Sequence, residues 1–387
     1  MTEHASFQNE IYLQGMGGVQ PSLPMEFSGL EAAAHDALSP EAFAYVAGSA
    51  GLERTAAANR DAFSRWKIVP RMMVDVAERD TSTQLLGTPL PSPIMTAPIG
   101  VQSIIHEEGE LAVARAAASL DVPMILSTAS SCSIEDVAAA SGDNPRWFQL
   151  YWPSERAVAA SLVERAEAAG YRAIVVTLDT KMMAWRPRDL QSAYLPFLQQ
   201  QGLANYKTDP AFLAGLEQPW DENVPMALLR WIGLFADKTV TWDDIDWLRS
   251  ITSLPIVVKG IQHVEDARRA VDVGIDALVV SNHGGRQVDN AVGALTVLPE
   301  VVDAAGDVPV LFDSGVRSGA DVFTALCLGA RAVLLGRPWV YGLALAGEDG
   351  VRHVLRSIMA EFDLTMALTG QTSVQELGRH LLRAPDA

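Results

Sequence analysis

Eight short apolar runs, each followed by a segment with helical character, limit the fold of this chain more than any other feature. They are Pro93 to Ile99, Pro123 to Ser127, Arg146 to Tyr151, Ala173 to Thr177, Pro255 to Lys259, Ala277 to Ser281, Val310 to Asp313 and Ala332 to Gly336. Continuous apolar runs of this kind are typical of strands buried on both faces of a parallel sheet. Alternating β and α units in this number favour a closed barrel over an open sheet. We therefore expect an α/β fold, a (β/α)8 TIM barrel.

Two regions lie outside this repeat. Residues 1–90 precede the first run and include a helical stretch from Gly29 to Ser49, and residues 181–240 form a long insertion after the fourth run. Long insertions of this kind are usually functional lids or oligomer contacts. Because α/β barrels reach this length as one domain, we expect a single domain. It would comprise an N-terminal extension (1–90), a barrel (91–345) with the lid insertion (181–240), and a C-terminal helical segment (346–387).

The charge and cysteine content exclude several classes of protein. The chain carries 29 Lys and Arg against 47 Asp and Glu, a net charge of -18, so nucleic acid and anionic membranes would repel it. Its two cysteines, Cys132 and Cys327, form no CxxC pair, and it has neither an apolar N-terminal segment nor a run of 18 apolar residues. We expect a cytoplasmic protein without disulfides or a metal site, and without nucleic-acid or membrane partners.

Polar residues follow nearly every run, and this position carries the chemistry of barrel enzymes. Active sites in this fold lie at the carboxyl ends of the strands. The residues found there are Ala97, Pro98, Ile99 and Gly100; Ser127; Gln149 and Tyr151; Thr177 and Asp179; Lys259; Ser281 and His283; Asp313 to Arg317; and Gly336 and Arg337. A barrel mouth built only for stability would not need so many polar groups, so we expect an active site here.

The last two runs predict a phosphate site. They continue into DSGVRSG (Asp313 to Gly319) and GRP (Gly336 to Pro338). Loops after strands seven and eight commonly bind phosphate in this fold, where glycines admit backbone N–H groups and arginines supply charge. Arg317 and Arg337 are the candidates, and the alternative is two ordinary turns with surface arginines. The sequence contains no GxGxxG opening a helix and no GxxxxGK[ST], which argues against Rossmann and P-loop sites.

The block SNHGGRQ, Ser281 to Gln287, predicts a catalytic base and an anion clamp. Only His283 among the histidines follows a predicted strand, and histidine is suited to accepting a proton near neutral pH. Arg286 could bind a carboxylate together with Arg188 from the segment WRPRD, because two arginines give oriented, bidentate binding. The alternatives are a structural histidine for His283 and a surface ion pair for Arg188.

Three further residues keep open roles. Lys259 could form a Schiff base, stabilise negative charge on a cofactor, or pair with a structural acid. Tyr45 and Tyr151 offer hydroxyl groups, although a tyrosine considered alone is more often a packing residue.

Taken together, five motifs resemble the FMN-dependent 2-hydroxy acid oxidising family. They are FQLYWP, TLDT with RPRDL, PIVVKG, SNHGGRQ, and the DSGVRSG-to-GRP segment, and the resemblance extends from about residue 10 to residue 375. Within the family, the opening segment NEIYLQGMGGVQPSLPM and the insertion are most similar to lactate 2-monooxygenase. FMN-dependent isomerases and nucleotide-type dehydrogenases share the barrel and the phosphate site but lack the His-Gly-Gly-Arg block.

The resemblance implies a role for each candidate residue. FMN would be bound by Ala97, Pro98, Ile99, Gly100, Ser127, Gln149, Thr177, Lys259, Ser281, Asp313, Ser314, Gly315, Arg317, Gly336 and Arg337. The substrate carboxylate would be bound by Tyr45, Arg188 and Arg286, and its 2-hydroxyl by Tyr151. His283 would take the proton, and Asp179 would stabilise the protonated ring. Lys259 would stabilise the reduced flavin.

The implied reaction is the oxidation of an L-2-hydroxy acid with O2, and lactate 2-monooxygenase would convert L-lactate to acetate, CO2 and water. Gly100 favours this outcome, since peroxide-releasing relatives tend to have alanine there. Two residues depart from the pattern: Ala129 replaces an aromatic residue and suggests a roomier pocket, and Lys181 replaces a large apolar one. The alternatives are an oxidase that releases keto acid and hydrogen peroxide, including one that acts on a larger substrate, and a non-catalytic flavin-binding barrel. The family also implies a homotetramer or homo-octamer.

Overall fold

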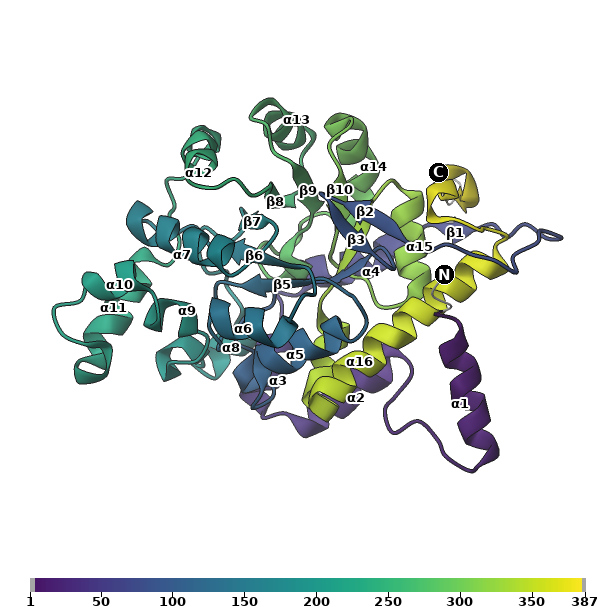
Figure 1. Cartoon of the computed structure of the whole chain (residues 1–387), viewed down its shortest axis with the longest axis horizontal. Helices are drawn as coiled ribbons and strands as arrows, with labels where there is room; N and C mark the ends of the chain where they lie inside the picture. Colours follow the sequence, from purple (N-terminus) through teal and green to yellow (C-terminus); the bar gives the residue numbers. More distant parts are fainter. Residues whose placement is uncertain (1–3, 385–387) are drawn as a thin grey trace.

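The computed structural model describes residues 4–384 and contains a closed barrel of parallel strands (Figure 1). The strands are β4 (Ile94–Thr96), β5 (Met124–Ser127), β6 (Arg146–Leu150), β7 (Ile174–Thr177), β8 (Ile256–Ile261), β9 (Ala277–Val280), β10 (Val310–Phe312) and β11 (Ala332–Leu335). They follow each other around the barrel in chain order, and β11 pairs with β4 to close it. The predicted TIM barrel is therefore confirmed, and each strand falls within or overlaps its predicted run.

The outer layer consists of helices that follow the strands. They are α5 (Gly109–Ala118), α6 (Ile134–Ser141), α7 (Arg156–Ala168), α12 (Ile245–Ile251), α13 (Val264–Asp272), α14 (Ala294–Ala305), α15 (Gly319–Cys327) and α16 (Arg337–Leu368). Alternate strand residues, such as Ile125, Trp147 and Val175, fill the barrel interior and are buried. Ser133 caps α6 by accepting a hydrogen bond from the backbone N–H of Asp136.

The N-terminal extension contains α1 (Ser6–Met16), α2 (Phe27–Ala37), α3 (Pro40–Ala47) and α4 (Arg54–Ser64). The single helical stretch expected from Gly29 to Ser49 is wrong, because Pro40 begins a new helix and Ser39 caps it from an extended conformation. A proline disfavours helical geometry at the residue before it. The hairpin of β2 (Thr83–Leu85) and β3 (Thr88–Leu90) closes the amino-terminal end of the barrel, where Leu85 and Leu90 join the interior core.

The C-terminal segment is only partly helical. A break in α16 at Ala346 and Gly347 divides that element into two helices. After Leu368 the chain forms two 3-10 turns, Val374–Glu376 and Arg379–Leu381, and strand β12 (Leu382–Arg383), which pairs with β1 (Lys67–Ile68). Within residues 4–384, no helix has the length and apolar character required to cross a membrane.

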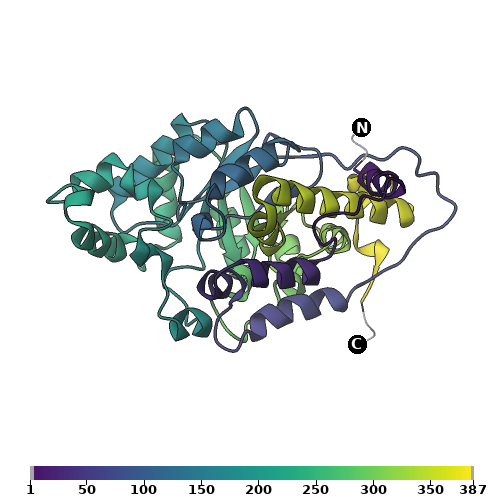
Figure 2. The ribbon, with the colours of Figure 1, turned by 90° about the horizontal axis from the view of Figure 1, so that it is seen from below.

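The lid insertion, residues 181–240, folds into short helices around an aromatic core. They are α8 (Pro187–Gln191), α9 (Ala204–Lys207), α10 (Pro210–Ala214) and α11 (Val224–Leu234), with 3-10 turns at Pro196–Gln199 and Trp220–Glu222. Helices α9 to α11 lie at the opposite end of the molecule from both termini in two perpendicular views (Figures 1 and 2). Lys181 is exposed, but its Nζ donates to the backbone oxygen of Val240 at 2.6 Å and joins the two ends of the insertion.

Candidate active site

A cavity of about 340 Å³ opens at the carboxyl ends of the barrel strands. The strand register places Ser127 opposite Gln149, and Thr177 opposite Lys259, so that side chains from different runs meet at this end. The predicted site residues that line the cavity are Tyr45, Ala97, Pro98, Ile99, Gly100, Tyr151, Lys259, His283, Arg286, Asp313, Ser314, Gly315, Arg317, Gly336 and Arg337. Four more predicted residues are buried near the cavity: Ser127, Gln149, Thr177 and Ser281. Asp179 does not line the cavity itself but binds His283, which does.

His283 follows β9 and is held by Asp179, which follows β7. The His283 Nδ1 lies 2.8 Å from Asp179 Oδ1, and both side chains are largely buried. Burial alone would raise the pKa of Asp179, but His283 and Lys259 outweigh burial and lower it. The carboxylate therefore accepts the Nδ1 proton of His283, and Nε2 remains as a basic nitrogen.

Burial lowers the pKa of His283 more than Asp179 raises it. The imidazole is therefore neutral near neutral pH, the form that a general base requires. The backbone of the loop that carries His283 has an unusual conformation. His283 itself has a left-handed φ of 58°, and a Cβ on Gly285 would lie only 2.7 Å from the backbone nitrogen of Ala56, which is too close for a side chain. The paired glycines thus allow α4 to pack against the loop that carries His283.

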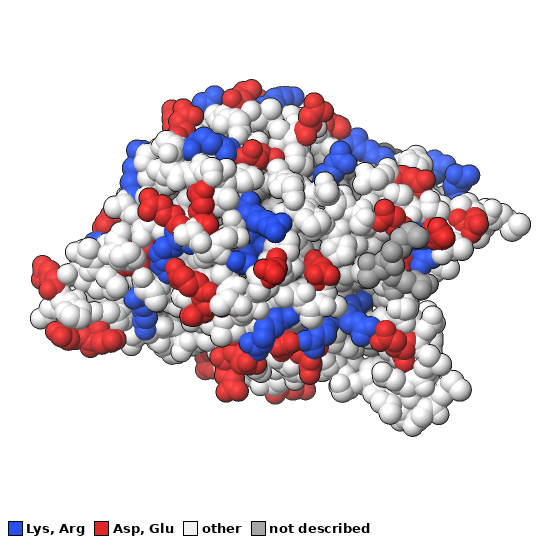
Figure 3. All heavy atoms as spheres, viewed as in Figure 1, with Lys and Arg blue, Asp and Glu red and all other residues white. Residues whose placement is uncertain are grey.

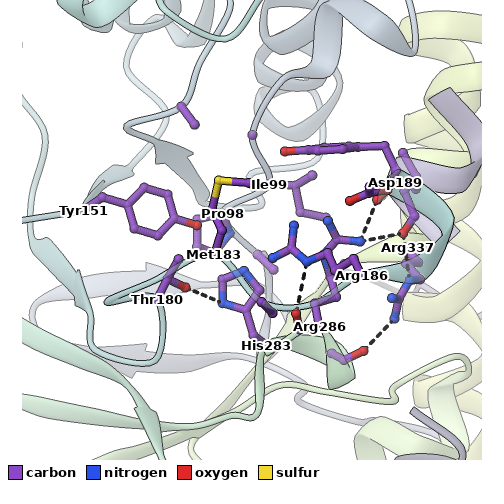
Figure 4. Close-up of a pocket in the computed structure, with 18 of the residues that line it drawn as sticks. Pro98, Ile99, Tyr151, Thr180, Met183, Arg186, Asp189, His283, Arg286 and Arg337 are labelled. Carbon is purple, nitrogen blue, oxygen red and sulfur yellow. Dashed lines mark hydrogen bonds between the residues drawn. The ribbon is translucent and has the colours of Figure 1, made fainter. Parts of the chain in front are cut away.

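Tyr45 and Tyr151 reach the cavity from α3 and from the end of β6. Burial raises the pKa of both phenols, that of Tyr151 to about 12. Both hydroxyl groups are therefore protonated and can donate hydrogen bonds to an anionic or carbonyl oxygen. In Figure 4, Tyr151, His283, Arg186 and Arg286 extend toward a common space.

The arginine pair differs from the prediction in one member. Arg188 does not line the cavity; its Nη2 lies 2.6 Å from Glu53 Oε2, and its side chain is 45% exposed. Arg186 lines the cavity instead, next to Arg286. Arg186 precedes α8 in an extended conformation, whereas Arg188 lies in the first helical turn, where Glu53 binds it. The assignment of Arg188 is therefore corrected to Arg186.

Arg286 is fixed by backbone oxygens. Its Nη1 donates to the oxygens of Tyr45 and Gly48 at 2.6 and 2.7 Å, and its guanidinium lies 5.3 Å from the centre of the Tyr45 ring. Burial, together with repulsion from Arg186 and Arg337, lowers the pKa of Arg286 to about 9. An anion bound at this group would relieve both effects, so the site favours a carboxylate.

Lys259 is buried and paired with an acid. This environment bears on the three roles left open by the sequence: a Schiff base, stabilisation of negative charge on a cofactor, and pairing with a structural acid. Its Nζ lies 3.1 Å from Asp313 Oδ2 and donates to Ser281 Oγ at 2.9 Å. Burial alone would lower the pKa of Lys259, but Asp313 and Asp179 outweigh burial and raise it. A protonated amine cannot attack a carbonyl, so the arrangement disfavours a Schiff base and leaves Lys259 as a fixed positive charge on the cavity wall.

Two further buried arginines line the cavity, and one of them, Arg337, donates at 3.1 Å to the same Gly48 oxygen as Arg286. Arg317 follows β10 and Arg337 follows β11; burial lowers the pKa of both, and Arg337 also lowers that of Arg317, to about 9. A Cβ on Gly336 would meet only Ile99, at 3.6 Å, so the backbone there is open to a ligand. Paired guanidinium groups beside such a backbone are suited to a phosphate group.

The buried side of the cavity offers an unpaired donor. Gln149 Oε1 accepts a hydrogen bond from Ser127 Oγ at 3.0 Å, while Gln149 Nε2 is buried without a hydrogen-bond partner. A buried N–H group without a partner costs about 1–3 kcal/mol. A polar ring edge bound between Gln149 and Lys259 would satisfy this donor and face the positive charge.

Sequence reasoning missed several residues that the structure brings to the cavity. Arg186 and Asp189 were within the quoted segment WRPRD, but neither was singled out. Gln287, within SNHGGRQ, does not line the cavity but accepts a hydrogen bond from Arg186. The lid insertion contributes Met183, Leu190, Leu195, Phe197, Trp231 and Phe235. Spacing along the chain gave no sign of these contacts.

A barrel with a buried histidine–aspartate pair and four arginines at its cavity fits an enzyme that binds an anionic substrate and a phosphorylated cofactor. The model of the FMN-dependent dehydrogenase family matches residues 34–384. The chain is 45% identical over 383 residues to the FMN-dependent alpha-hydroxy acid dehydrogenase qulF of Penicillium citrinum, covering 98% of this chain and 95% of that one. It is 43% identical over 359 residues to an L-lactate oxidase of Lysinibacillus sphaericus, covering 92% of each.

Among solved structures, mandelate oxidase superposes with a TM-score of 0.82 at 41% identity, covering 93% of this chain and 98% of that one. The chain therefore belongs to the FMN-dependent dehydrogenase family, whose matched members include 2-hydroxy acid dehydrogenases and oxidases. It is an FMN-dependent oxidoreductase, as the sequence motifs predicted. The residues fit this cofactor: Arg317 and Arg337 would hold its phosphate, and Gln149 and Lys259 the polar edge of its ring.

Proposed function

We propose that the chain oxidises an L-2-hydroxy acid, with His283 as the base. The Asp179–His283 pair beside Arg186 and Arg286 is the observation that carries this proposal. The two guanidinium groups and the Tyr45 hydroxyl bind the substrate carboxylate, and the Tyr151 hydroxyl binds the 2-hydroxyl group. His283 Nε2 takes the proton that leaves the substrate, and the Asp179 carboxylate stabilises the imidazolium ion that forms.

FMN supplies the two-electron oxidation when bound, and O2 is the final acceptor. The role of the protein is to orient C2 of the substrate and to keep water away from it. Lys259 contributes a fixed positive charge on the cofactor side of the cavity, held by Asp313 and Ser281. Such preorganised charge stabilises negative charge that develops during reaction.

The fate of the keto acid decides between two activities. We propose that the keto acid is retained and is decarboxylated by hydrogen peroxide, as in lactate 2-monooxygenase: L-lactate and O2 give acetate, CO2 and water. The lid insertion supports retention, because it supplies a wall of the cavity through Phe197, Trp231 and Phe235. Product release is then set by lid opening.

The second candidate is an oxidase that releases the keto acid and hydrogen peroxide. The small side chain of Ala129 at the cavity wall favours it, as do the curated relatives named as oxidases. The two candidates differ in product. In air, L-lactate should give mainly acetate with little peroxide if the keto acid is retained, whereas equal amounts of pyruvate and peroxide would mean an oxidase.

The base assignment has its own test. The variant His283→Asn should keep bound FMN and lose about a hundred- to ten-thousand-fold in the rate of anaerobic flavin reduction. Near-normal reduction in this variant would exclude His283 as the base. Retained FMN absorbance serves as the control that the fold is intact.

We further propose a homo-oligomer, a tetramer or octamer, in the cytoplasm. Tyr12, Leu13 and Met16 of α1 are each more than 60% exposed, and the surface over α1 is largely uncharged (Figure 3, lower right). Exposed apolar surface of this kind favours association. The free cysteines Cys132 and Cys327 are compatible with a reducing compartment. Sedimentation of the holoenzyme tests the oligomer, and a monomer at working concentration would refute it.

A further inference from the structure

One sulfur side chain, that of Met183, lines the cavity. The chain has 12 methionines and two cysteines, and within residues 4–384 Met183 is the only one of them in the cavity wall. Figure 4 shows its side chain among the residues that extend into the cavity. A thioether neither binds a carboxylate nor moves a proton, so the proposed reaction gives Met183 no role.

The backbone is fixed on both sides of Met183. The oxygen of Met182 accepts a hydrogen bond from Gln287 Nε2 at 3.2 Å. The oxygen of Trp185 accepts one from the backbone N–H of Gly51 at 2.9 Å. The two adjacent methionines are almost equally exposed, 63% for Met182 and 60% for Met183, but only Met183 lines the cavity. They therefore differ in what they face rather than in how exposed they are.

The proposed reaction forms an oxidant for this thioether. This inference rests on the proposed oxidation of a 2-hydroxy acid, in which O2 takes up two electrons and two protons and becomes hydrogen peroxide. Even in the whole cavity of about 340 Å³, one peroxide molecule has a local concentration on the order of 5 M. Peroxide that has left the protein is diluted into the solvent and reaches every exposed methionine alike. Met183 therefore meets newly formed peroxide at a far higher concentration than Met182 does.

We propose that hydrogen peroxide formed in the cavity oxidises Met183 to methionine sulfoxide. The sulfur lone pair attacks one peroxide oxygen, and the S–O bond forms while the O–O bond breaks. The second oxygen takes up both hydrogens and leaves as water, so that sulfur loses two electrons and the peroxide gains them. The step needs no oxidant other than this peroxide, and methionine oxidation of this kind is common in proteins.

The oxidation converts an apolar side chain of the cavity into a polar one. A sulfoxide oxygen accepts hydrogen bonds, and Arg186 and Tyr151, which line the same cavity, are donors. The sulfoxide competes with the substrate for these donors, so oxidation should raise the KM for the hydroxy acid more than it lowers kcat. Because Met183 is exposed, a methionine sulfoxide reductase can reach it and reverse the change. Met183 thus links turnover to a reversible loss of activity.

The test is turnover of the holoenzyme in air, with catalase present to destroy peroxide that leaves the protein. The substrate is L-lactate, or (S)-mandelate if L-lactate does not reduce the bound flavin. Peptide mass spectrometry then measures the gain of one oxygen atom at each methionine, and fragment ions separate Met182 from Met183. Oxidation at Met183 should exceed that at Met182, and that at the fully exposed Met73, at least about tenfold. Equal oxidation at Met182 and Met183 would overturn the inference.

Added peroxide is the control for exposure. Without substrate, hydrogen peroxide in the solution should oxidise Met73 and Met182 at least as fast as Met183, because exposure then decides the order. The same preference for Met183 with added peroxide would also overturn the inference, since it would not come from peroxide formed in the cavity. If neither acid reduces the flavin, the proposed function falls, and this inference falls with it. If turnover proceeds without oxidation at Met183, the proposed function stands and only this inference is refuted.

Matched variants connect the oxidation with activity. Met183→Leu removes the sulfur but keeps an apolar side chain of similar volume, so the fraction of activity lost over the same number of turnovers should fall by at least about half. Met182→Leu, at the equally exposed neighbour, should lose activity as the wild type does. In the oxidised wild type, a methionine sulfoxide reductase with a thiol should lower the KM again. Equal losses in the two variants, or no recovery after reduction, would refute the link to activity, and the peptide measurement on the wild type depends on neither variant.

Discussion

Gln287 and Arg186 are joined by a hydrogen bond of 2.9 Å, from Arg186 Nη2 to Gln287 Oε1. The same amide donates through Nε2 to the backbone oxygens of Asp179 at 2.6 Å and Met182 at 3.2 Å. One side chain on the His283 loop therefore fixes the orientation of Arg186, which would bind the substrate carboxylate, and the position of the strand end that carries Asp179. Gln287 is a positioning residue in the proposed reaction.

Replacing Gln287 tests this role. Gln287→Met should weaken binding of a carboxylate inhibitor about tenfold, because the Arg186 fork loses a fixed partner. FMN should remain bound, since Gln287 does not line the cavity. The matched control is Gln262→Met, which removes an exposed amide that donates to the Val292 oxygen. Inhibitor binding measured by flavin absorbance reports the result, and equal affinities in the two variants would contradict the role.

Arg186 and Arg188 provide a second matched pair. Arg186→Lys keeps the charge but loses the bidentate fork, so the KM for the hydroxy acid should rise about 10- to 100-fold. Arg188→Lys should change the KM less than about threefold, because an exposed ion pair such as that with Glu53 contributes about 0–1 kcal/mol. The reverse order of effects in steady-state kinetics would restore Arg188 as the clamp.

The pH dependence follows from the pKa of His283. The base must be neutral to accept a proton, and burial lowers the pKa of His283 below its ordinary value of 6.5. Activity is therefore retained below pH 6.5 and is lost only as the pH falls through the lower pKa of the folded enzyme. In Asp179→Asn the carboxylate that raises the pKa of His283 is lost. The acidic limb of the pH profile, where activity falls because His283 is protonated, should therefore move to still lower pH.

The same variant should reduce flavin about a hundred- to ten-thousand-fold more slowly, since the imidazolium ion is no longer stabilised. The measurement is the pH profile of kcat/KM in wild type and variant. An acidic limb above pH 6.5 in the wild type, or one that rises in Asp179→Asn, would contradict this account.

Arg317 should affect the cofactor rather than the substrate. Its guanidinium is buried, lies 4.1 Å from the centre of the Phe27 ring, and has no acidic hydrogen-bond partner among the described residues. Arg317→Met should raise the dissociation constant for FMN about 10- to 100-fold, the loss of one charge-assisted hydrogen bond. Arg331→Met removes an exposed arginine before β11 and should leave the dissociation constant for FMN unchanged. Titration of the apoprotein with FMN distinguishes the two.

Gly100 tests retention of the keto acid. A Cβ at this position would lie 2.8 Å from the Ala129 Cβ and 2.9 Å from the Ala129 oxygen, which accepts a hydrogen bond from Val101. Gly100→Ala must therefore displace the Ala129 loop and loosen its contact with the lid, so pyruvate and peroxide should increase at the expense of acetate. Gly233→Ala on α11 has open space and is the control. An unchanged ratio of acetate to pyruvate in Gly100→Ala would show that Gly100 does not control retention of the keto acid.

The barrel could be predicted because its signals are local. Each strand is a continuous apolar run, and a parallel sheet places the ends of all runs at one rim. The break at Pro40 was missed, although its signal is also local, since Ser39 and Pro40 together form a cap and a first helical residue. These features depend on neighbours in sequence rather than on packing.

The choice between Arg186 and Arg188 could not be predicted in the same way. The segment RPRD offers two arginines, and Pro187 fixes the start of α8 between them. Which of them faces the cavity depends on where the segment carrying Glu53 docks, a contact between residues 135 apart in the chain. The lid contacts have the same origin, because Phe235 packs against Tyr151 only after the lid insertion has folded over the barrel.

The hydrogen bond from Lys181 to Val240 gives the insertion a narrow neck, because its first and last residues lie within 2.6 Å of each other at these atoms. The entropy of closing a loop depends only weakly on its length, about 0.6 kcal/mol for each doubling. Segments of different length can therefore be exchanged at this neck with little cost to the barrel. The insertion, which supplies Arg186 and the aromatic wall of the cavity, is thus a replaceable module, and it can change in evolution while Asp179 and His283, which lie outside it, stay unchanged.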